Sequence, residues 1–119
     1  MRSGLAKGCG VVLVALMATQ AAAMSLREMR ALEKNEAQGG LYTTYYLVGA
    51  VEALIEAQAE AQRQGQSRRF CPTGQGLAPP EVRSLFQTEL GRDGGLYEAD
   101  MPVQWVVLSA LAARFPCTP

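Results

Sequence analysis

The positions of the cysteines limit the fold of this 119-residue chain more than any other feature of its sequence. Cys9 lies in an apolar stretch near the N-terminus, whereas Cys71 and Cys117 lie far apart in the rest of the chain. If the N-terminal stretch is removed on export, only one intramolecular pairing is left. We therefore predict a disulfide between Cys71 and Cys117, and the alternative is a pair of free, buried thiols.

The first 23 residues have the three-part layout of a secretion signal. Basic Arg2 and Lys7 precede an apolar stretch at residues 9–18, and small residues follow up to Ala23. The apolar stretch is too short for a membrane-spanning helix, which needs about 20 residues. We expect residues 1–23 to be a signal peptide cleaved after Ala23. Residues 24–119 would then be one mature domain, located in the periplasm and not inserted in the membrane.

The composition of the remaining chain excludes several classes of function. The sequence contains no histidine, so Ser-His-Asp and Cys-His catalysis are excluded and the commonest ligand of zinc and haem is missing. Without Arg2 and Lys7 the domain carries 9 basic and 11 acidic residues, a balance that does not suggest nucleic-acid binding. We expect no enzymatic activity, no metal site and no cofactor.

The first half of the domain has two helical patterns. Ser25 and Glu28 have the spacing of a capping box, which predicts a first helix that ends before Gly39-Gly40. Apolar residues at helical spacing from Leu41 to about Gln64 predict a long central helix, although residues 42–48 also have high strand propensity. Gly49 in this helix suggests a place where another backbone comes close.

The second half of the domain predicts two more helices. Pro79 suits the first turn of a third helix, which we expect Gly91 and Gly94-Gly95 to stop. Asp100 is the expected N-cap of a strongly apolar fourth helix that ends at Pro116 and should be the most buried of the four. The predicted fold is all-α: a small four-helix orthogonal or bundle-like domain closed by one disulfide.

Several polar and aromatic clusters have two possible interpretations. Three glutamates at successive turns form either a solvated acidic stripe or a site for a cation or acid/base chemistry: Glu52, Glu56 and Glu60. Three arginines either solvate a connector or bind an anion: Arg63, Arg68 and Arg69. Four aromatic residues form core, dimer surface or a ligand platform: Tyr42, Tyr45, Tyr46 and Trp105. Gly74-x-Gly76 is interpreted as a turn, because it lacks the context of a phosphate-binding loop.

Two segments resemble one known family. Residues 45–54 (YYLVGAVEAL) are similar to its G-Y-V-x-G-V-x-D-A-L helix. Phe70-Cys71-Pro72 and residues 110–117 (ALAARFPC) are similar to its F-C-I-P entry and its A-L-x-x-x-F-P-C ending. The family is the Rap/Tai-type periplasmic immunity proteins of type VI secretion, and the resemblance extends over residues 41–117.

The resemblance implies a small, helical, usually dimeric protein that binds and blocks a peptidoglycan-cleaving amidase effector without catalysis of its own. The chain departs from the family pattern at three places. Many members have another cysteine pair, with one cysteine before the long helix. In this chain residues 35–40 (NEAQGG), which occupy that region, contain no cysteine. Glu52 replaces the aspartate of the helix motif, and Tyr45 replaces its first glycine. Only the Cys71–Cys117 bridge is carried over from the family.

An inhibitor of this kind needs a loop or helix face that covers the target's active site. The segment 91–100 is long, rich in glycine and mixed in charge, so we expect partner contacts from Arg92, Asp93, Tyr97 and Glu98, with Tyr97 as an aromatic anchor. The alternative is an ordinary solvated loop. Two other functions fit an exported helical domain: a periplasmic acid-stress chaperone, and an envelope protein that binds an unknown partner.

Overall fold

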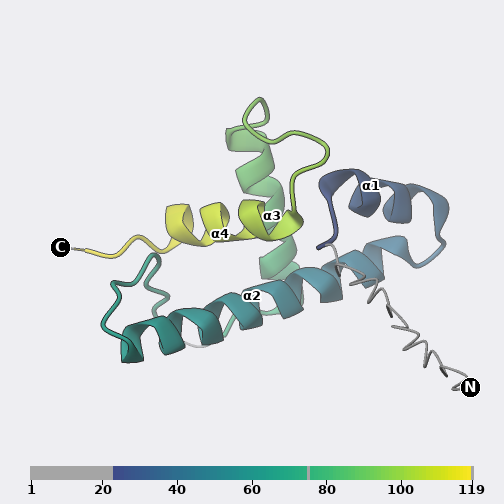
Figure 1. Ribbon diagram of the computed structural model, residues 1–119. Helices are drawn as coiled ribbons and strands as arrows, with labels where there is room; N and C mark the ends of the chain where they lie inside the picture. The colour runs from purple at the N-terminus through teal and green to yellow at the C-terminus, as the bar shows by residue number, and fades with distance from the viewer. Residues whose placement is uncertain (1–22, 75, 119) are drawn as a thin grey trace, which may run out of the picture.

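The computed structural model describes residues 23–74 and 76–118, which contain four helices and no strand: α1 (Leu26–Asn35), α2 (Gly39–Arg63), α3 (Pro79–Arg92) and α4 (Val103–Arg114) (Figure 1). The predicted all-α fold is therefore confirmed, and the alternative strand at residues 42–48 is wrong. Residues 1–22 of the expected signal peptide lie outside the described part. No described helix is both long enough and apolar enough to span a membrane.

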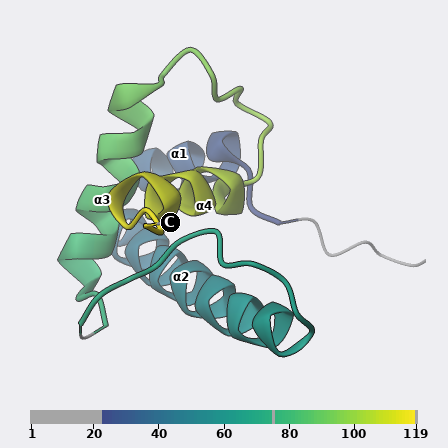
Figure 2. The same cartoon turned by 90° about the vertical axis from the view of Figure 1, so that its left-hand side faces the viewer.

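The long helix α2 is the base on which the other helices pack. Helix α1 covers its N-terminal half, α4 lies over it, and α3 stands steeply against both α2 and α4 (Figures 1 and 2). The connection from α2 to α3 passes below the C-terminal end of α4, where the chain ends. This arrangement brings the two predicted cysteine partners to the same side of the molecule.

The core lies where the four helices meet. Its largest fully buried side chains come from every helix and from the α2–α3 connection: Leu26, Leu47, Phe70, Val82, Val103, Val106, Val107 and Leu111. Each such side chain contributes roughly 1.5–3 kcal/mol by leaving water. Five of the 12 residues of α4 are buried, compared with five of the 25 of α2. The prediction that the fourth helix is the most buried one is consistent with this.

Helices α1 and α4 begin next to each other and satisfy each other's backbone groups. The predicted capping box of α1 is present, with Ser25 N donating to the Glu28 carboxylate at 2.7 Å and Glu28 N donating to Ser25 Oγ at 3.2 Å. Two further N–H groups, those of Leu26 and Arg27, donate to carbonyls in the loop before α4. The segment before α4 is thereby fixed to the start of α1.

This pairing explains why the expected N-cap of α4 is wrong. Pro102 holds the N-cap position of α4, and no side chain caps the helix. Val103 N donates instead to Met24 O at 2.9 Å, so the preceding segment satisfies that group. Asp100 lies beside α1 and pairs with Arg27 Nε at 2.9 Å.

Three glycines differ from their expected roles. Gly39 begins α2 rather than ending α1, and a Cβ on it would collide with the Leu32 carbonyl of α1. The close approach of a second backbone therefore occurs at Gly39 and not at Gly49, which is exposed with no atom within 4 Å of a Cβ position. Gly91 lies inside α3, which continues to Arg92 because the last turn still forms its hydrogen bonds; the helix ends before Gly94-Gly95, as predicted.

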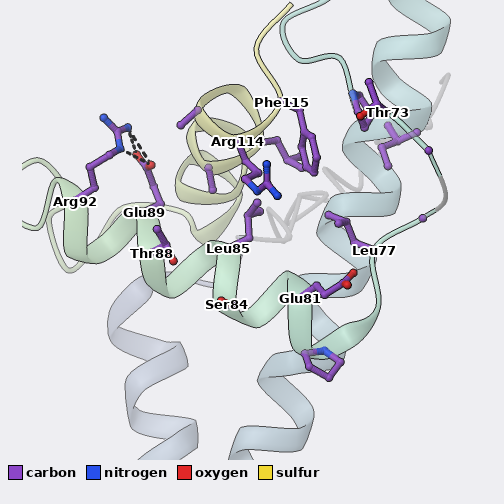
Figure 3. Close-up of a pocket in the computed structure, with 18 residues that line it drawn as sticks. Thr73, Leu77, Glu81, Ser84, Leu85, Thr88, Glu89, Arg92, Arg114 and Phe115 are labelled. Carbon is purple, nitrogen blue, oxygen red and sulfur yellow. Dashed lines mark hydrogen bonds and ion pairs between the residues drawn. The ribbon is translucent and has the colours of Figure 1, made fainter.

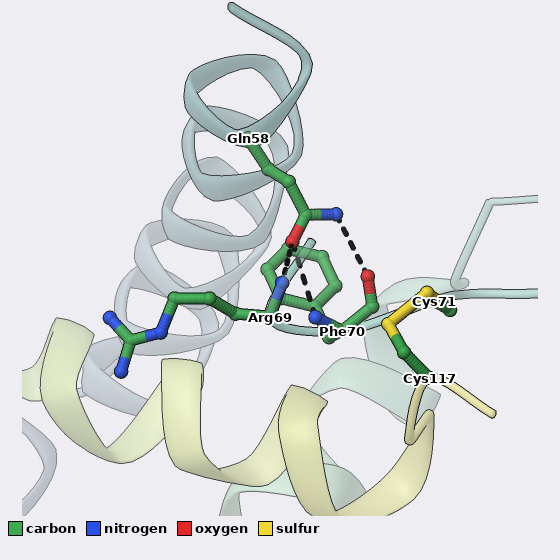
Figure 4. The surroundings of a disulfide bond; sticks show 5 residues. All are labelled: Gln58, Arg69, Phe70, Cys71 and Cys117. Carbon is green, nitrogen blue, oxygen red and sulfur yellow. Dashed lines mark hydrogen bonds between the residues drawn. A yellow bond between two sulfur atoms is a disulfide. The ribbon is translucent and has the colours of Figure 1, made fainter. Parts of the chain in front are cut away.

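The predicted disulfide is present between Cys71 and Cys117, with a Cα–Cα distance of 5.0 Å (Figure 4). The Cys71 N–H donates to the Phe115 carbonyl at 2.7 Å beside it. On the other side, the Gln58 amide of α2 accepts from Phe70 N at 3.2 Å and donates to Phe70 O at 2.8 Å. These contacts attach the α2–α3 connection to two helices and direct the Phe70 ring into the core.

A polar cluster joins α1, α2 and α3 at the opposite end of α2. The Glu33 carboxylate accepts from Thr43 Oγ1 at 2.6 Å and from Arg83 Nη2 at 2.7 Å. Arg83 Nη1 also donates to the Thr43 and Thr44 hydroxyls at 3.1 and 3.2 Å. Partial burial raises the pKa of Glu33, but the hydrogen bonds from Thr43 and Arg83 and the charge of Arg83 outweigh it. The net pKa of Glu33 is lower than its ordinary value.

This cluster predicts a loss of stability in acid. Because the pKa of Glu33 is lowered by folding, its contribution is complete above pH ~4.5 and is lost as the pH falls through the lower folded pKa. We expect Glu33→Gln to cost about 1 kcal/mol at pH 7 and to reduce the pH dependence below pH 4.5. Urea unfolding at pH 7, 4.5 and 3 measures both effects. Glu56→Gln, on the exposed face of α2, is the matched control; an identical acid response in both variants would contradict the assignment to Glu33.

Candidate functional site

The loop between α3 and α4 is attached to α3 through a buried carboxylate. Glu89 is 2% exposed, and both of its oxygens accept from Arg92, with Nη2–Oε1 and Nε–Oε2 distances of 2.8 and 3.1 Å. The Tyr97 hydroxyl donates to Glu89 Oε1 at 2.6 Å. Arg92 Nη1 also lies 3.6 Å from the carboxylate of Asp93, the C-cap residue of α3. A charged group at this depth is stabilised only by such partners.

The structure brings the four predicted contact residues to one corner but gives Tyr97 a different role. Its side chain is 9% exposed and belongs to the core, so it does not present a ring to a partner as expected. The physical reason is the buried Glu89 carboxylate, which needs a donor from the loop. Arg92 and Glu98 are exposed and Asp93 is half-buried. The exposed apolar side chain of this loop is Leu96, at 59%, which the sequence analysis did not select.

Replacing Tyr97 by phenylalanine removes the hydroxyl and keeps the ring. We expect a loss of about 2 kcal/mol in the free energy of unfolding, because a buried carboxylate loses one donor. Tyr45→Phe, at an exposed position on α2, should change stability by less than about 0.5 kcal/mol. Chemical denaturation of the two variants measures the difference, and equal stability would show that Glu89 does not depend on this hydrogen bond.

Burial raises the pKa of the Tyr97 hydroxyl, and its hydrogen bond to Glu89 raises it further. A raised pKa in the folded state means that the neutral hydroxyl stabilises the fold below pH ~10 and that this contribution is lost as the pH rises through the higher folded value. Near neutral pH the Tyr97 hydroxyl therefore keeps the proton that it donates to Glu89.

A groove of about 910 Å³ lies beside α3, on the side of the disulfide (Figure 3). One wall is α3 from Pro80 to Arg92, and the other consists of residues 72–74, 76 and 77 and the last turn of α4. Its floor is apolar, with Ile55, Leu85 and Leu111 from three different helices. Hydroxyl side chains lie along its walls: Thr73, Ser84 and Thr88.

The charges of the groove are distributed unequally. At one end, the Glu81 carboxylate accepts from the backbone N–H of Ala78, the N-cap residue of α3, at 3.0 Å. At the other end Glu89 and Arg92 neutralise each other. Between them the guanidinium carbon of Arg114 lies 5.3 Å from the centre of the Phe115 ring, and Figure 3 shows this side chain directed toward α3. None of the salt bridges among the described residues includes Arg114.

The other predicted clusters lie apart from the groove and the loop. Glu52, Glu56 and Glu60 are exposed on α2, and Glu60 pairs with Arg63 at 2.8 Å. In the described part of the chain, no group of three acidic or cysteine side chains could hold a metal ion. Arg68 and Arg69 are exposed on the α2–α3 connection. Gly74 has a φ of +92°, which fits the predicted turn.

The four aromatic residues divide into one structural and three exposed side chains. The Tyr46 hydroxyl accepts from Met24 N at 3.1 Å and from Gln104 Nε2 at 2.6 Å, so Tyr46 joins the N-terminal segment to α2 and α4. Tyr42 and Tyr45 lie on exposed positions of α2, and Trp105 is exposed on α4. Tyr46 is therefore part of the packing, while the other three remain available as surface.

The sequence analysis missed the groove, although its signals were partly visible. Phe115 was part of the segment that carries the resemblance. Nothing in the one-dimensional pattern indicates that Ile55, Leu77 and Leu85 meet at an open depression, because they belong to separate segments.

The chain matches no family model, no curated protein and no solved structure in comparisons with known proteins. The resemblance to the Rap/Tai-type proteins therefore rests on the two sequence segments quoted above.

Proposed function

We propose that this protein is exported to the periplasm and acts there as an immunity protein, which binds and inhibits a peptidoglycan amidase delivered by type VI secretion. The observation that supports this most is that the two ends of the second resembling segment lie together in the structure. Phe70-Cys71-Pro72 and Phe115-Pro116-Cys117 form one unit, joined by the disulfide and by the 2.7 Å hydrogen bond from Cys71 N to Phe115 O. The disulfide also fits an oxidising compartment, where such bonds persist.

Inhibition by occlusion requires a rigid surface rather than reacting groups. The α3–α4 loop has this property, because Tyr97 attaches its middle to Glu89 and the N-terminal amides of α1 bind its end. Leu96 and Glu98 are left exposed on this supported segment. A loop that is already ordered loses less entropy on binding, which favours tight association with a target cleft. Dimerisation of the protein is part of the same proposal.

The test is a capture experiment followed by an activity assay. Oxidised protein is used as bait in periplasmic and secreted fractions, and a retained peptidoglycan amidase is then assayed on purified peptidoglycan with increasing amounts of the protein. We expect amidase activity to disappear near a one-to-one ratio. An amidase that keeps its activity in excess protein would contradict the proposal. Retention of many unrelated proteins only at acid pH would favour the chaperone instead.

Variants locate the inhibitory surface in the same assay. We expect Leu96→Asp and Glu98→Lys to weaken inhibition by at least tenfold, because they alter the exposed part of the loop. Glu56→Lys introduces the same charge change as Glu98→Lys on the exposed face of α2 and should leave inhibition unchanged. Equal inhibition by all three variants would place the contact surface outside this loop.

A further inference from the structure

We propose that the groove beside α3 binds an extended segment of a partner protein in which a carboxylate side chain lies next to an apolar one. The identity of the partner as an amidase rests on the proposed function, whereas the chemistry of the segment follows from the groove itself. Three features of the groove carry the inference: its length, the guanidinium of Arg114 without a salt bridge among the described residues, and its hydroxyl-lined walls.

The length of the groove fits a short stretch of extended chain. The wall formed by α3 runs from Pro80 to Arg92, which is about 18 Å at 1.5 Å per helical residue. An extended segment rises about 3.3 Å per residue, so five or six residues span this wall. The volume of about 910 Å³ leaves room for their side chains along the apolar floor.

The position of Arg114 favours a negatively charged group next to it, away from Glu81 at one end of the groove. The Glu89 carboxylate already accepts hydrogen bonds from Arg92 and Tyr97. The Glu81 carboxylate accepts from the backbone N–H of Ala78 at the start of α3. Arg114 forms no salt bridge with any residue in the described part of the chain, and its guanidinium lies over the Phe115 ring between the two ends of the groove. A guanidinium in this position offers a fork of N–H donors that fits a carboxylate. Arg114 is the last residue of α4, and its guanidinium lies next to the side chains of Leu85 and Phe115.

The surroundings of Arg114 specify the rest of the segment. Leu85 and Phe115 flank the guanidinium and would contact an apolar side chain next to the carboxylate. The hydroxyls of Ser84 and Thr88 on one wall, and of Thr73 on the other, can donate to peptide carbonyls and accept from peptide N–H groups on both sides of an extended chain. Hydrogen-bonding groups on both walls favour a peptide over a purely apolar chain such as a lipid tail.

The probe for this inference is a phage-displayed library of random linear dodecapeptides, selected on the oxidised protein. We expect enriched peptides to contain aspartate or glutamate beside leucine, isoleucine or phenylalanine. A synthetic peptide of one enriched sequence should bind at least tenfold more tightly than its counterpart with the carboxylate changed to a carboxamide. In NMR spectra of the wild-type protein, its addition should shift the amide signals of residues that line the groove.

Two pairs of variants test the position of the site. Arg114→Gln should abolish the preference for the carboxylate peptide, while Arg68→Gln, the same change on the α2–α3 connection outside the groove, should keep it. Ser84→Trp should fill the groove and prevent binding, while Gln87→Trp on the next turn of α3 should not. Thermal unfolding of each variant, compared with the wild type, establishes that the fold is intact.

The proposal is overturned if the selection enriches no peptide, if enriched peptides lack a carboxylate, or if peptides shift signals away from the groove in the wild-type protein. Equal binding to the Arg114→Gln and Arg68→Gln variants would also overturn it. These outcomes are independent of the amidase assay. Peptide binding without amidase inhibition would contradict only the proposed function. Amidase inhibition without selected peptides would contradict only the groove.

Discussion

Removing the disulfide between Cys71 and Cys117 is expected to lower the free energy of unfolding by about 4 kcal/mol. The two cysteines are separated by 46 positions in the sequence, and closing a loop of this length removes roughly that amount of entropy from the unfolded chain. Total stabilities of small domains are about 5–15 kcal/mol. Urea unfolding of the oxidised wild type and of the Cys71→Ser/Cys117→Ser double variant measures the effect.

The control for this prediction is chemical reduction. A reducing agent should shift the midpoint of the wild type toward that of the double variant and should leave the double variant unchanged. If reduction does not shift the wild-type midpoint, the connection from α2 to α3 is held by its hydrogen bonds to Gln58 and Phe115 alone. That result would also remove the reason to expect this protein to depend on an oxidising compartment.

Phe70→Ala should have an effect of similar size, about 3–5 kcal/mol, because it leaves a cavity in the core. The Phe70 side chain is 1% exposed, and the Gln58 amide holds its backbone on both sides. These hydrogen bonds limit how far the connection can move to fill the space. Denaturant unfolding of the oxidised variant measures the loss, with the disulfide intact so that the two effects remain separate.

Trp105→Ala is the matched comparison. It removes a larger aromatic side chain, but Trp105 is 63% exposed, so we expect a change of less than about 0.5 kcal/mol. Losses of equal size in the two variants would contradict the assignment of Phe70 to the core. A loss for Trp105→Ala that depends on protein concentration would instead show that this side chain is buried between copies of the chain.

Contacts around the core hold both candidate surfaces in place. The disulfide, Gln58 and Phe70 hold the α2–α3 connection from one side, and this connection forms one wall of the groove. The carboxylate of Glu89 holds the α3–α4 loop at the other end of the same groove. Arg92 contacts Glu89 and also lines the groove, so the loop and the groove form one continuous surface beside α3.

Sequence patterns were sufficient for the parts of the fold that depend on local chemistry. The helices followed from apolar spacing, the start of α1 from the Ser25–Glu28 capping box and the start of α3 from Pro79. The disulfide followed from the number of cysteines, since only one pairing remained. Each of these features depends on neighbours in the sequence or on simple counting, and the structure confirms all of them.

Features that depend on distant residues were not predictable in the same way. Asp100 has the character of an N-cap, but tertiary contacts placed it beside Arg27 and gave the cap position of α4 to Pro102. Tyr97 was predicted to be an exposed anchor, but its hydroxyl donates to the buried carboxylate of Glu89, eight residues earlier. At Tyr97, leaving the buried Glu89 carboxylate without this donor would cost about 1–3 kcal/mol, which outweighs exposure of the ring. At Asp100, Met24 O accepts from Val103 N, so the start of α4 does not depend on a side-chain cap worth about 1 kcal/mol.

The sequence alone thus determined which segments are helical, which cysteines pair and which residue types are available for chemistry. The tertiary structure decided which polar side chains are used for internal support and which remain on the surface. The groove, the attachment of the loop and the exposure of Arg114 and Leu96 belong to this second group. Their positions depend on how four helices pack around a shared core, and hydrophobic packing is non-directional, so no local pattern encodes it.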